Sequence, residues 1–131
     1  MIVVDASVVV GFLLDPALTA PALAAFHAAD DDLHAPAHLD LEVASAIRRH
    51  VAAGLAAVSR ADAAMVDLAD LPITRHPVEP LMPRVWGLRA DVSPYDAAYL
   101  ALAEGLGAPL LTLDRRLHRA VATSAEVRLL T

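Results

Sequence analysis

The sequence predicts an α/β fold in which a central, mainly parallel sheet lies between helices. Short apolar runs rich in Val, Ile and Leu alternate with longer helical segments. The short runs are apolar on both faces, which is typical of parallel sheets that helices cover on both sides. The chain has 131 residues, the size of one domain, so we expect residues 1–131 to form a single domain.

The first half of the chain is expected to hold two strands and four helices. The first strand, residues 2–4, ends at Asp5, and the second, residues 33–35, follows a solvated turn of three acids at 30–32. Thr19 is expected to begin the second helix, Gly54 to end the third and Ser59 to cap the fourth. The four helices are therefore expected at residues 6–14, 19–29, 39–53 and 59–69.

The second half is expected to continue the alternation and to close the sheet. Prolines at 80 and 83 delay or interrupt a helix within residues 77–89. Ser93 as N-cap, Pro94 at the first helical position and Asp96 at the third begin a strong helix that ends at Gly105 or Gly107. Strands are expected at residues 71–75, 109–113 and 127–130, with a last helix at residues 115–122.

Composition excludes several kinds of site. The chain has no Cys, and therefore neither disulfides nor a thiolate zinc site nor a cysteine nucleophile. All ten basic residues are Arg, which excludes a Schiff-base or phosphate-loop lysine. The formal net charge of −6 makes the chain a poor nonspecific nucleic-acid binder. The start has no basic segment, and its apolar run stops at Asp15, too early to span a bilayer; we expect a cytoplasmic protein.

Four acids are candidates for a functional site, and each also has a structural interpretation. Asp5 and Asp114 follow the first and fourth strands, and either side chain could cap the next helix. Asp96 completes a capping box with Ser93. Glu42 lies within a helix, on a solvated face or in a salt bridge to Arg48 or Arg49.

The combination of these acids is more informative than any one of them. Ligands of parallel sheets lie at the carboxyl ends of the strands, where a switch in strand order opens a crevice. Carboxylates ~5 Å apart repel by roughly 3 kcal/mol at an effective dielectric of ~20, so a cluster needs protons or a cation. Oxygen ligands select Mg²⁺ or Mn²⁺, and such ions activate water for phosphodiester hydrolysis.

Four motifs together resemble the PIN domain family, and in particular the VapC toxins of bacterial type II toxin–antitoxin systems. The resemblance covers essentially the whole chain, and the motifs occur in order. They are Val3-Val4-Asp5-Ala6-Ser7, Leu41-Glu42-Val43-Ala44-Ser45, Ser93-Pro94-Tyr95-Asp96-Ala97-Ala98-Tyr99-Leu100-Ala101-Leu102-Ala103 and Leu111-Thr112-Leu113-Asp114-Arg115-Arg116-Leu117. Two departures are small: Ser93 stands where Thr is usual, and Ser45 where Asn is frequent.

The resemblance implies a PIN-like three-layer fold and a Mg²⁺- or Mn²⁺-dependent endoribonuclease. It would cut RNA, commonly tRNA or rRNA, with metal-activated water, leaving a 5′-phosphate and a 3′-hydroxyl. Ser7 and Thr112 match hydroxyl positions beside the site. The implied partners are a small VapB-like antitoxin and a second copy of the chain, as a homodimer within a hetero-oligomer. The implied catalytic, metal-binding acids are Asp5, Glu42, Asp96 and Asp114.

Basic and aromatic residues are weaker candidates. Arg48, Arg49, Arg115 and Arg116 are possible RNA contacts, with ordinary solvated arginines as the alternative. The six histidines show no zinc spacing, and His38, one helical turn before Glu42, is interpreted as a surface or helix-start residue. Trp86 and Leu88 are interpreted as core or dimer surface.

Rival functions share the fold but lack support in the residues. A phosphoacceptor receiver domain needs a lysine, and a haloacid-dehalogenase-like phosphatase needs Asp-x-Asp where this chain has Asp5-Ala6-Ser7. The alternative from another class is a non-catalytic PIN-like module that only sequesters antitoxin or RNA. Metal-dependent stabilisation or cleavage would distinguish it from the nuclease.

Overall fold

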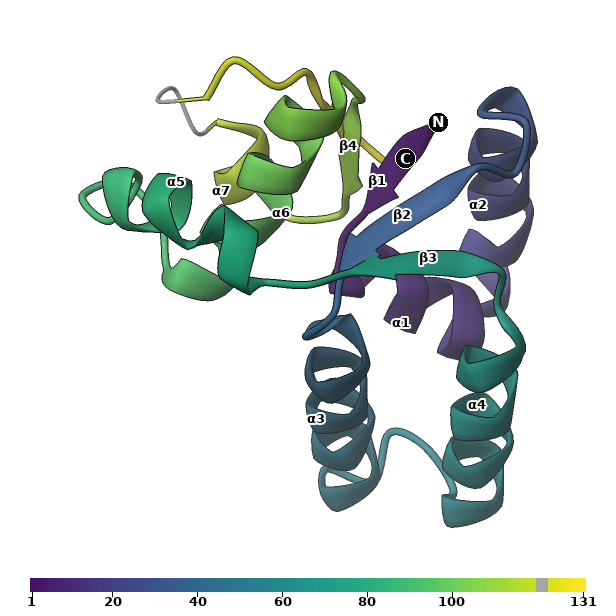
Figure 1. Cartoon of the computed structure of the whole chain (residues 1–131). Helices are drawn as coiled ribbons and strands as arrows, with labels where there is room; N and C mark the ends of the chain where they lie inside the picture. Colours follow the sequence, from purple (N-terminus) through teal and green to yellow (C-terminus); the bar gives the residue numbers. More distant parts are fainter. Residues whose placement is uncertain (120–122) are drawn as a thin grey trace.

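A five-stranded parallel sheet forms the centre of the computed structural model, which describes residues 1–119 and 123–131 (Figure 1). The strand order is β3-β2-β1-β4-β5, and every pairing is parallel. The α/β class and the parallel sheet that the sequence predicts are confirmed. The strands are β1 (Ile2–Val4), β2 (Leu33–Pro36), β3 (Ile73–His76), β4 (Leu110–Thr112) and β5 (Val127–Leu129).

Helices cover both faces of this sheet. On one face α6 (Pro94–Leu106) contacts β1, β2 and β4, and on the other α1 (Ala6–Leu14) contacts β4 (Figure 1). Helix α1 is packed in turn against α2 (Pro16–Ala28), α3 (Leu39–Ala52) and α4 (Val58–Asp70). The short segments η1 (Glu79–Leu81) and α5 (Met82–Gly87) lie against α6, and α7 (Arg115–His118) lies against β4 and β5.

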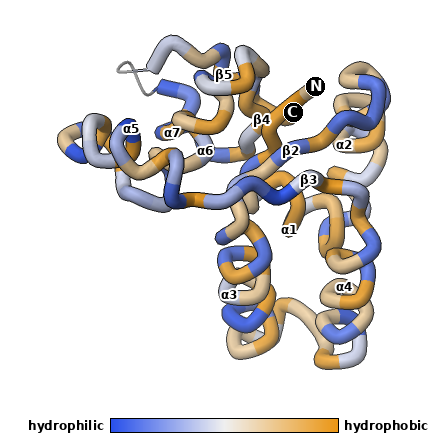
Figure 2. The backbone as a smooth tube through the Cα atoms, in the orientation of Figure 1, coloured by the Kyte–Doolittle hydropathy of each residue, from blue (hydrophilic) through white to orange (hydrophobic). Residues whose placement is uncertain are grey.

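The core lies between the sheet and its two covering helices. Val3 and Val4 are fully buried on β1, as are Val8 and Val9 on α1. Every residue of α6 from 97 to 103 is buried, and four of these are alanines, whose small side chains let the helix approach the strands closely. In Figure 2 the backbone of β1 and α1 is largely hydrophobic, whereas hydrophobic and hydrophilic residues alternate along α3 and α4.

Three of the expected helix limits are wrong. Helix α2 begins at Pro16 rather than at Thr19, because Asp15 caps the backbone N–H of Ala17 at 2.9 Å and Pro16 suits the first helical position. Helix α4 begins at Val58, so Ser59 lies in its first turn and no side chain caps it. Helix α7 ends at His118; positions 120–122 of the expected helix lie outside the described residues.

The direction of strand order changes between β1 and β4. From β1 the chain adds β2 and then β3 on one side, whereas β4 and β5 lie on the other. Asp5 follows β1, and its backbone N–H bonds to the carbonyl of Leu111 at 3.0 Å, while Asp114 follows β4. The two acids therefore lie at the switch point, where α/β sheets open a crevice at their carboxyl edge. None of the described helices has the length and hydrophobicity needed to cross a bilayer.

Candidate metal centre

One open cleft of about 850 Å³ lies at the carboxyl edge of the sheet, and all four candidate acids line it. They come from four separate parts of the chain: Asp5 after β1, Glu42 in α3, Asp96 in the first turn of α6 and Asp114 before α7. The fold thus brings together residues that are up to 109 positions apart, from 5 to 114. The structural interpretation of each acid depends on what its carboxylate contacts.

The Asp5 carboxylate is buried and held by two hydroxyl groups. Its Oδ2 accepts hydrogen bonds from Ser7 Oγ and Thr112 Oγ1, both at 2.7 Å, and the residue is only 6% exposed. The two hydroxyls accept in turn from the backbone N–H groups of Leu113 and Asp114, each at 3.0 Å. Asp5 occupies the N-cap position of α1 but makes no side-chain capping bond, so the capping interpretation fails for this residue.

Charges within the cleft act on one another. Burial raises the pKa of Asp5, and the hydrogen bonds from Ser7 and Thr112 oppose this, while the charge of Glu42 raises it further. Burial also raises the pKa of Asp96, and the charges of Asp5, Asp114 and Glu42 each add to that rise. These mutual effects show that the carboxylates share one electrostatic environment, in which a bound cation would be favoured.

Glu42 is held by groups on α6 and at the start of α3. Tyr99, fully buried on α6, donates its hydroxyl hydrogen to Glu42 Oε1 at 2.8 Å. His38 Nε2 lies 2.9 Å from the same oxygen. Arg49 instead donates to Ser45 Oγ at 3.0 Å, and among the described residues no arginine forms an ion pair with Glu42, so the salt bridge, one of the two structural alternatives for Glu42, is wrong.

Asp114 and Asp96 keep part of their structural interpretation. Asp114 Oδ1 caps α7 by accepting from the backbone N–H of Arg116 at 2.8 Å. Its Oδ2 accepts from Arg116 Nη2 at 3.1 Å, and the Arg116 side chain holds the pKa of Asp114 below its ordinary value. For Asp96 the cap runs through the backbone, because Ser93 Oγ accepts from the Asp96 N–H at 3.2 Å. The Asp96 carboxylate itself is partly buried in the cleft.

The chemistry of these donors fits a hard divalent cation. The cleft offers carboxylate oxygens and no sulfur, as Mg²⁺ and Mn²⁺ prefer. Among the described residues no three His, Asp or Glu side chains already stand as a cluster able to hold a metal. Asp114 is engaged by Arg116, so its side chain has to turn away from Arg116 before it can join the other acids around one ion. The buried Asp5, with a raised pKa and two hydroxyl donors on one oxygen, is the most firmly oriented of the four.

Only part of the expected basic surface lies at the cleft. Arg49 and Arg116 line it, whereas Arg48 lines a second groove between α3 and α4, and Arg115 is exposed outside the cleft. Arg60 also lines the cleft, where it donates to the carbonyl of Leu13. Nothing in the sequence pointed to Arg60, because only tertiary packing brings α4 against α1.

Two residues near Glu42 were missed or dismissed in the sequence. Tyr99 follows Asp96 by three positions, so both lie on the same face of α6, and that spacing was the available signal. His38 is indeed at the start of α3, but its side chain is only 17% exposed and faces Glu42. Of the aromatic segment, Leu88 is core at 1% exposure, whereas Trp86 is exposed and carries the Arg89 guanidinium 4.8 Å from its ring centre.

Comparisons with known proteins show the family and the fold of the chain. A family model described as the PIN domain matches residues 2–122. Ribonuclease VapC12 of Mycobacterium tuberculosis is 41% identical over 131 residues, which cover 98% of either chain. Ribonuclease VapC3 of the same organism is 43% identical over 121 residues, covering 91% of this chain and 86% of the relative. The crystal structure of PAE2754 from Pyrobaculum aerophilum superposes with a TM-score of 0.70 at 20% identity, over 96% of this chain and 81% of that one.

Proposed function

Since the chain belongs to the PIN domain family, and within it to the VapC ribonucleases, we propose that it is the toxin of a toxin–antitoxin pair and hydrolyses RNA with a divalent metal ion. The observation that carries the proposal is that four carboxylates from distant parts of the chain line one open cleft. A small VapB-like antitoxin encoded nearby, and tRNA or rRNA as substrate, follow from the same family membership.

The residues of the cleft have three different expected roles: metal binding, orientation of a metal ligand and contact with phosphate. Asp5, Glu42, Asp96 and Asp114 would hold Mg²⁺ or Mn²⁺, which when bound supplies a Lewis acid and lowers the pKa of water. Ser7 and Thr112 orient Asp5 through its Oδ2. Arg49, Arg60 and Arg116 surround the acids with positive charge, as binding of a phosphate backbone requires. Water as the nucleophile, rather than the ribose 2′-hydroxyl, gives a 5′-phosphate and a 3′-hydroxyl.

A non-catalytic module is the second candidate. The pairing of Arg116 with Asp114 favours it, because that cation already neutralises one acid of the site. Such a module would hold antitoxin or RNA without cutting and would need no metal. Binding of Mn²⁺ to the folded chain therefore separates the two candidates before any RNA is added.

The test compares Asp96→Asn with Asp91→Asn. Asp91 is an exposed acid just before α6 and lies outside the cleft, so its variant controls for the loss of one charge. We expect Asp96→Asn to weaken Mn²⁺ binding in calorimetry and to lower cleavage of purified tRNA and rRNA by more than about 100-fold, beyond the effect of losing a supporting residue. Asp91→Asn should match the unaltered chain.

The ends of the products complete the test. Sequencing should find 5′-phosphate and 3′-hydroxyl ends that depend on Mg²⁺ or Mn²⁺. Ends carrying 2′,3′-cyclic phosphate would contradict the mechanism. Equal Mn²⁺ affinity in Asp96→Asn and the unaltered chain would contradict the site and leave the non-catalytic module as the better description.

A further inference from the structure

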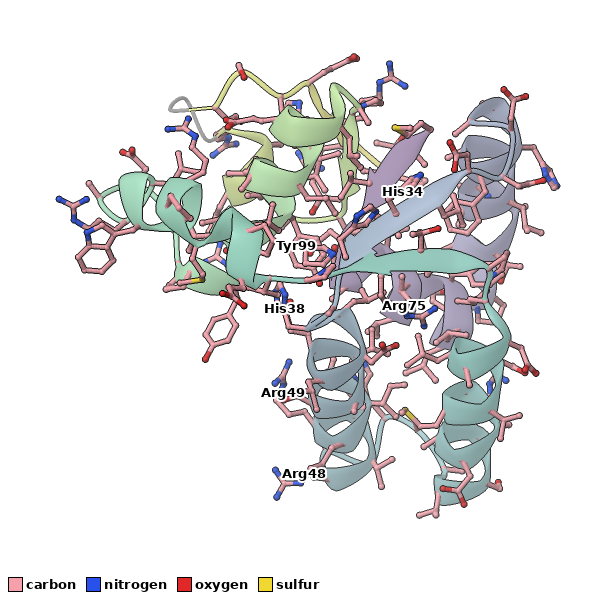
Figure 3. All side chains as sticks on the ribbon, in the orientation of Figure 1. His34, His38, Arg48, Arg49, Arg75 and Tyr99 are labelled. Carbon is pink, nitrogen blue, oxygen red and sulfur yellow. The ribbon has the colours of Figure 1, made fainter. Side chains whose placement is uncertain are left out.

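The carboxylate of Glu42 is anchored through one of its two oxygens. Tyr99 Oη lies 2.8 Å and His38 Nε2 lies 2.9 Å from Oε1. Figure 3 labels Tyr99, on α6, and His38, at the start of α3. Oε2 has no hydrogen bond or ion pair with any described residue. Glu42 lines the same cleft as the other three acids, so Oε2 is the Glu42 oxygen that is left to bind an ion there.

Tyr99 is well suited to hold this oxygen in place. Its side chain is fully buried, and its hydroxyl has one hydrogen to donate, with the oxygen 2.8 Å from Glu42 Oε1. A tyrosine also has two side-chain torsions and is fixed here by the core, so its hydroxyl has little freedom to move.

His38 connects the same oxygen to the backbone of α6. Its Nε2 lies 3.1 Å from the carbonyl oxygen of Tyr95 and 2.9 Å from Glu42 Oε1, and both partners accept, so Nε2 carries the hydrogen. Its Nδ1 is buried with no hydrogen-bond partner among the described residues. The ring also lies 5.0 Å from that of Tyr99.

We propose that Tyr99, supported by His38, is a positioning residue that fixes Glu42 through Oε1 and presents Oε2 to the metal ion. The inference rests on the proposed function, because it takes Glu42 as a metal ligand. Asp5 is arranged in the same way, with Ser7 and Thr112 both on Oδ2. Residues that orient metal ligands typically contribute 10- to 100-fold to metal affinity or activity. Without the Tyr99 hydroxyl, Glu42 would explore other rotamers and lose affinity for the ion.

The test measures Mn²⁺ affinity by calorimetry on the full chain without RNA, in Tyr99→Phe and Tyr95→Phe. Tyr95 is the matched control, because its hydroxyl has no partner among the described residues and its side chain is exposed. We expect Tyr99→Phe to bind Mn²⁺ at least about 10-fold more weakly, and Tyr95→Phe to bind as the unaltered chain does. Equal affinity in Tyr99→Phe and the unaltered chain would overturn the inference.

His38 gives a second pair of variants that does not disturb the core at Tyr99. The side-chain amide of His38→Gln can still donate to Glu42 Oε1, whereas His38→Leu cannot. We expect His38→Gln to retain most of the Mn²⁺ affinity and His38→Leu to bind Mn²⁺ at least about 10-fold more weakly. Equal affinities in these two variants would show that His38 does not help to position Glu42.

Asp96→Asn tells failure of the positioning role from failure of the proposed function. Loss of Mn²⁺ binding in Asp96→Asn, with unaltered binding in Tyr99→Phe, would overturn only the positioning role. Unaltered binding in both variants would overturn the proposed function as well.

Discussion

Replacing Asp5 by Asn should stabilise the metal-free protein, and most or all of this advantage over the unaltered chain should disappear once metal is present. An Asn side chain has nearly the same shape, and its carbonyl oxygen can accept the bonds that Ser7 and Thr112 now donate to Oδ2. The change therefore removes a buried charge while keeping the packing. Asp5 is a good subject because it is the most deeply buried of the four acids.

The expected gain follows from opposing terms. Two hydroxyl bonds lose their charge-assisted strength, about 1 kcal/mol each. Against this, the folded protein no longer pays the desolvation of a buried carboxylate, which is several kcal/mol in proteins. It also loses the repulsion between Asp5 and the carboxylates of Glu42 and Asp96, roughly 1 kcal/mol each after screening. The hydrogen-bond loss and the relief of repulsion nearly cancel, so the net change is close to the desolvation of the carboxylate, about 3 kcal/mol in favour of the variant, or roughly 9–15 °C in Tm for a chain of this size.

Thermal unfolding with EDTA and with Mn²⁺ checks this expectation. Without metal, Asp5→Asn should melt at the higher temperature. With Mn²⁺ at 100 times its dissociation constant, the unaltered chain should gain about 2.7 kcal/mol and the variant little, so most or all of the difference should disappear. A variant that melts lower in EDTA would refute the reasoning and make Asp5 a structural residue.

The pH dependence of the same difference gives an independent check. The pKa of Asp5 is raised in the folded state, so its protonated form stabilises the fold and this stability is lost as pH rises through the folded pKa. The advantage of Asp5→Asn should therefore be greatest at neutral pH. It should disappear as pH falls toward the ordinary aspartate value of 3.8, where the unaltered chain has taken up its proton.

Two further predictions concern charge outside the buried acid. Arg116→Ala should raise Mn²⁺ affinity about two- to five-fold, because it frees Asp114, and should weaken RNA binding. Arg115 is exposed outside the cleft, so Arg115→Ala should leave Mn²⁺ affinity unchanged. Calorimetry measures the Mn²⁺ affinity of the two variants, and filter binding measures their RNA affinity. Burial, and after it the neighbouring His34, lower the pKa of His76 in the folded protein, so the unfolded chain binds a proton at a higher pH than the folded chain does. The stability of the fold should therefore decrease as the pH falls below 6.5. The Tm measured between pH 5 and 8 should fall less steeply in His76→Gln, and an unchanged slope would exclude His76 as the cause.

Local sequence was enough to predict most of the fold. The short apolar runs at 2–4 and 110–112 predict strands that the structure confirms, and Ser93-Pro94 begins α6 because capping and proline geometry act within a few residues. Two helix-start signals lie close together before α2, and the prediction from Thr19 is wrong because Asp15-Pro16 begins the helix. Which signal begins the helix depends on which side chain can accept a hydrogen bond from a free backbone N–H of the first turn.

The sequence by itself determined which residues are acidic, which strands they follow and which family the chain resembles. Only the tertiary structure decided what each carboxylate contacts: Tyr99 rather than an arginine for Glu42, Arg116 for Asp114, and two hydroxyls for Asp5. The physical reason is range. Helix capping and the hydrophobic pattern of a strand involve residues that are close in the sequence. The charge and hydrogen bonding of a site depend instead on distances between elements that are far apart in the sequence and are brought together by packing of the core.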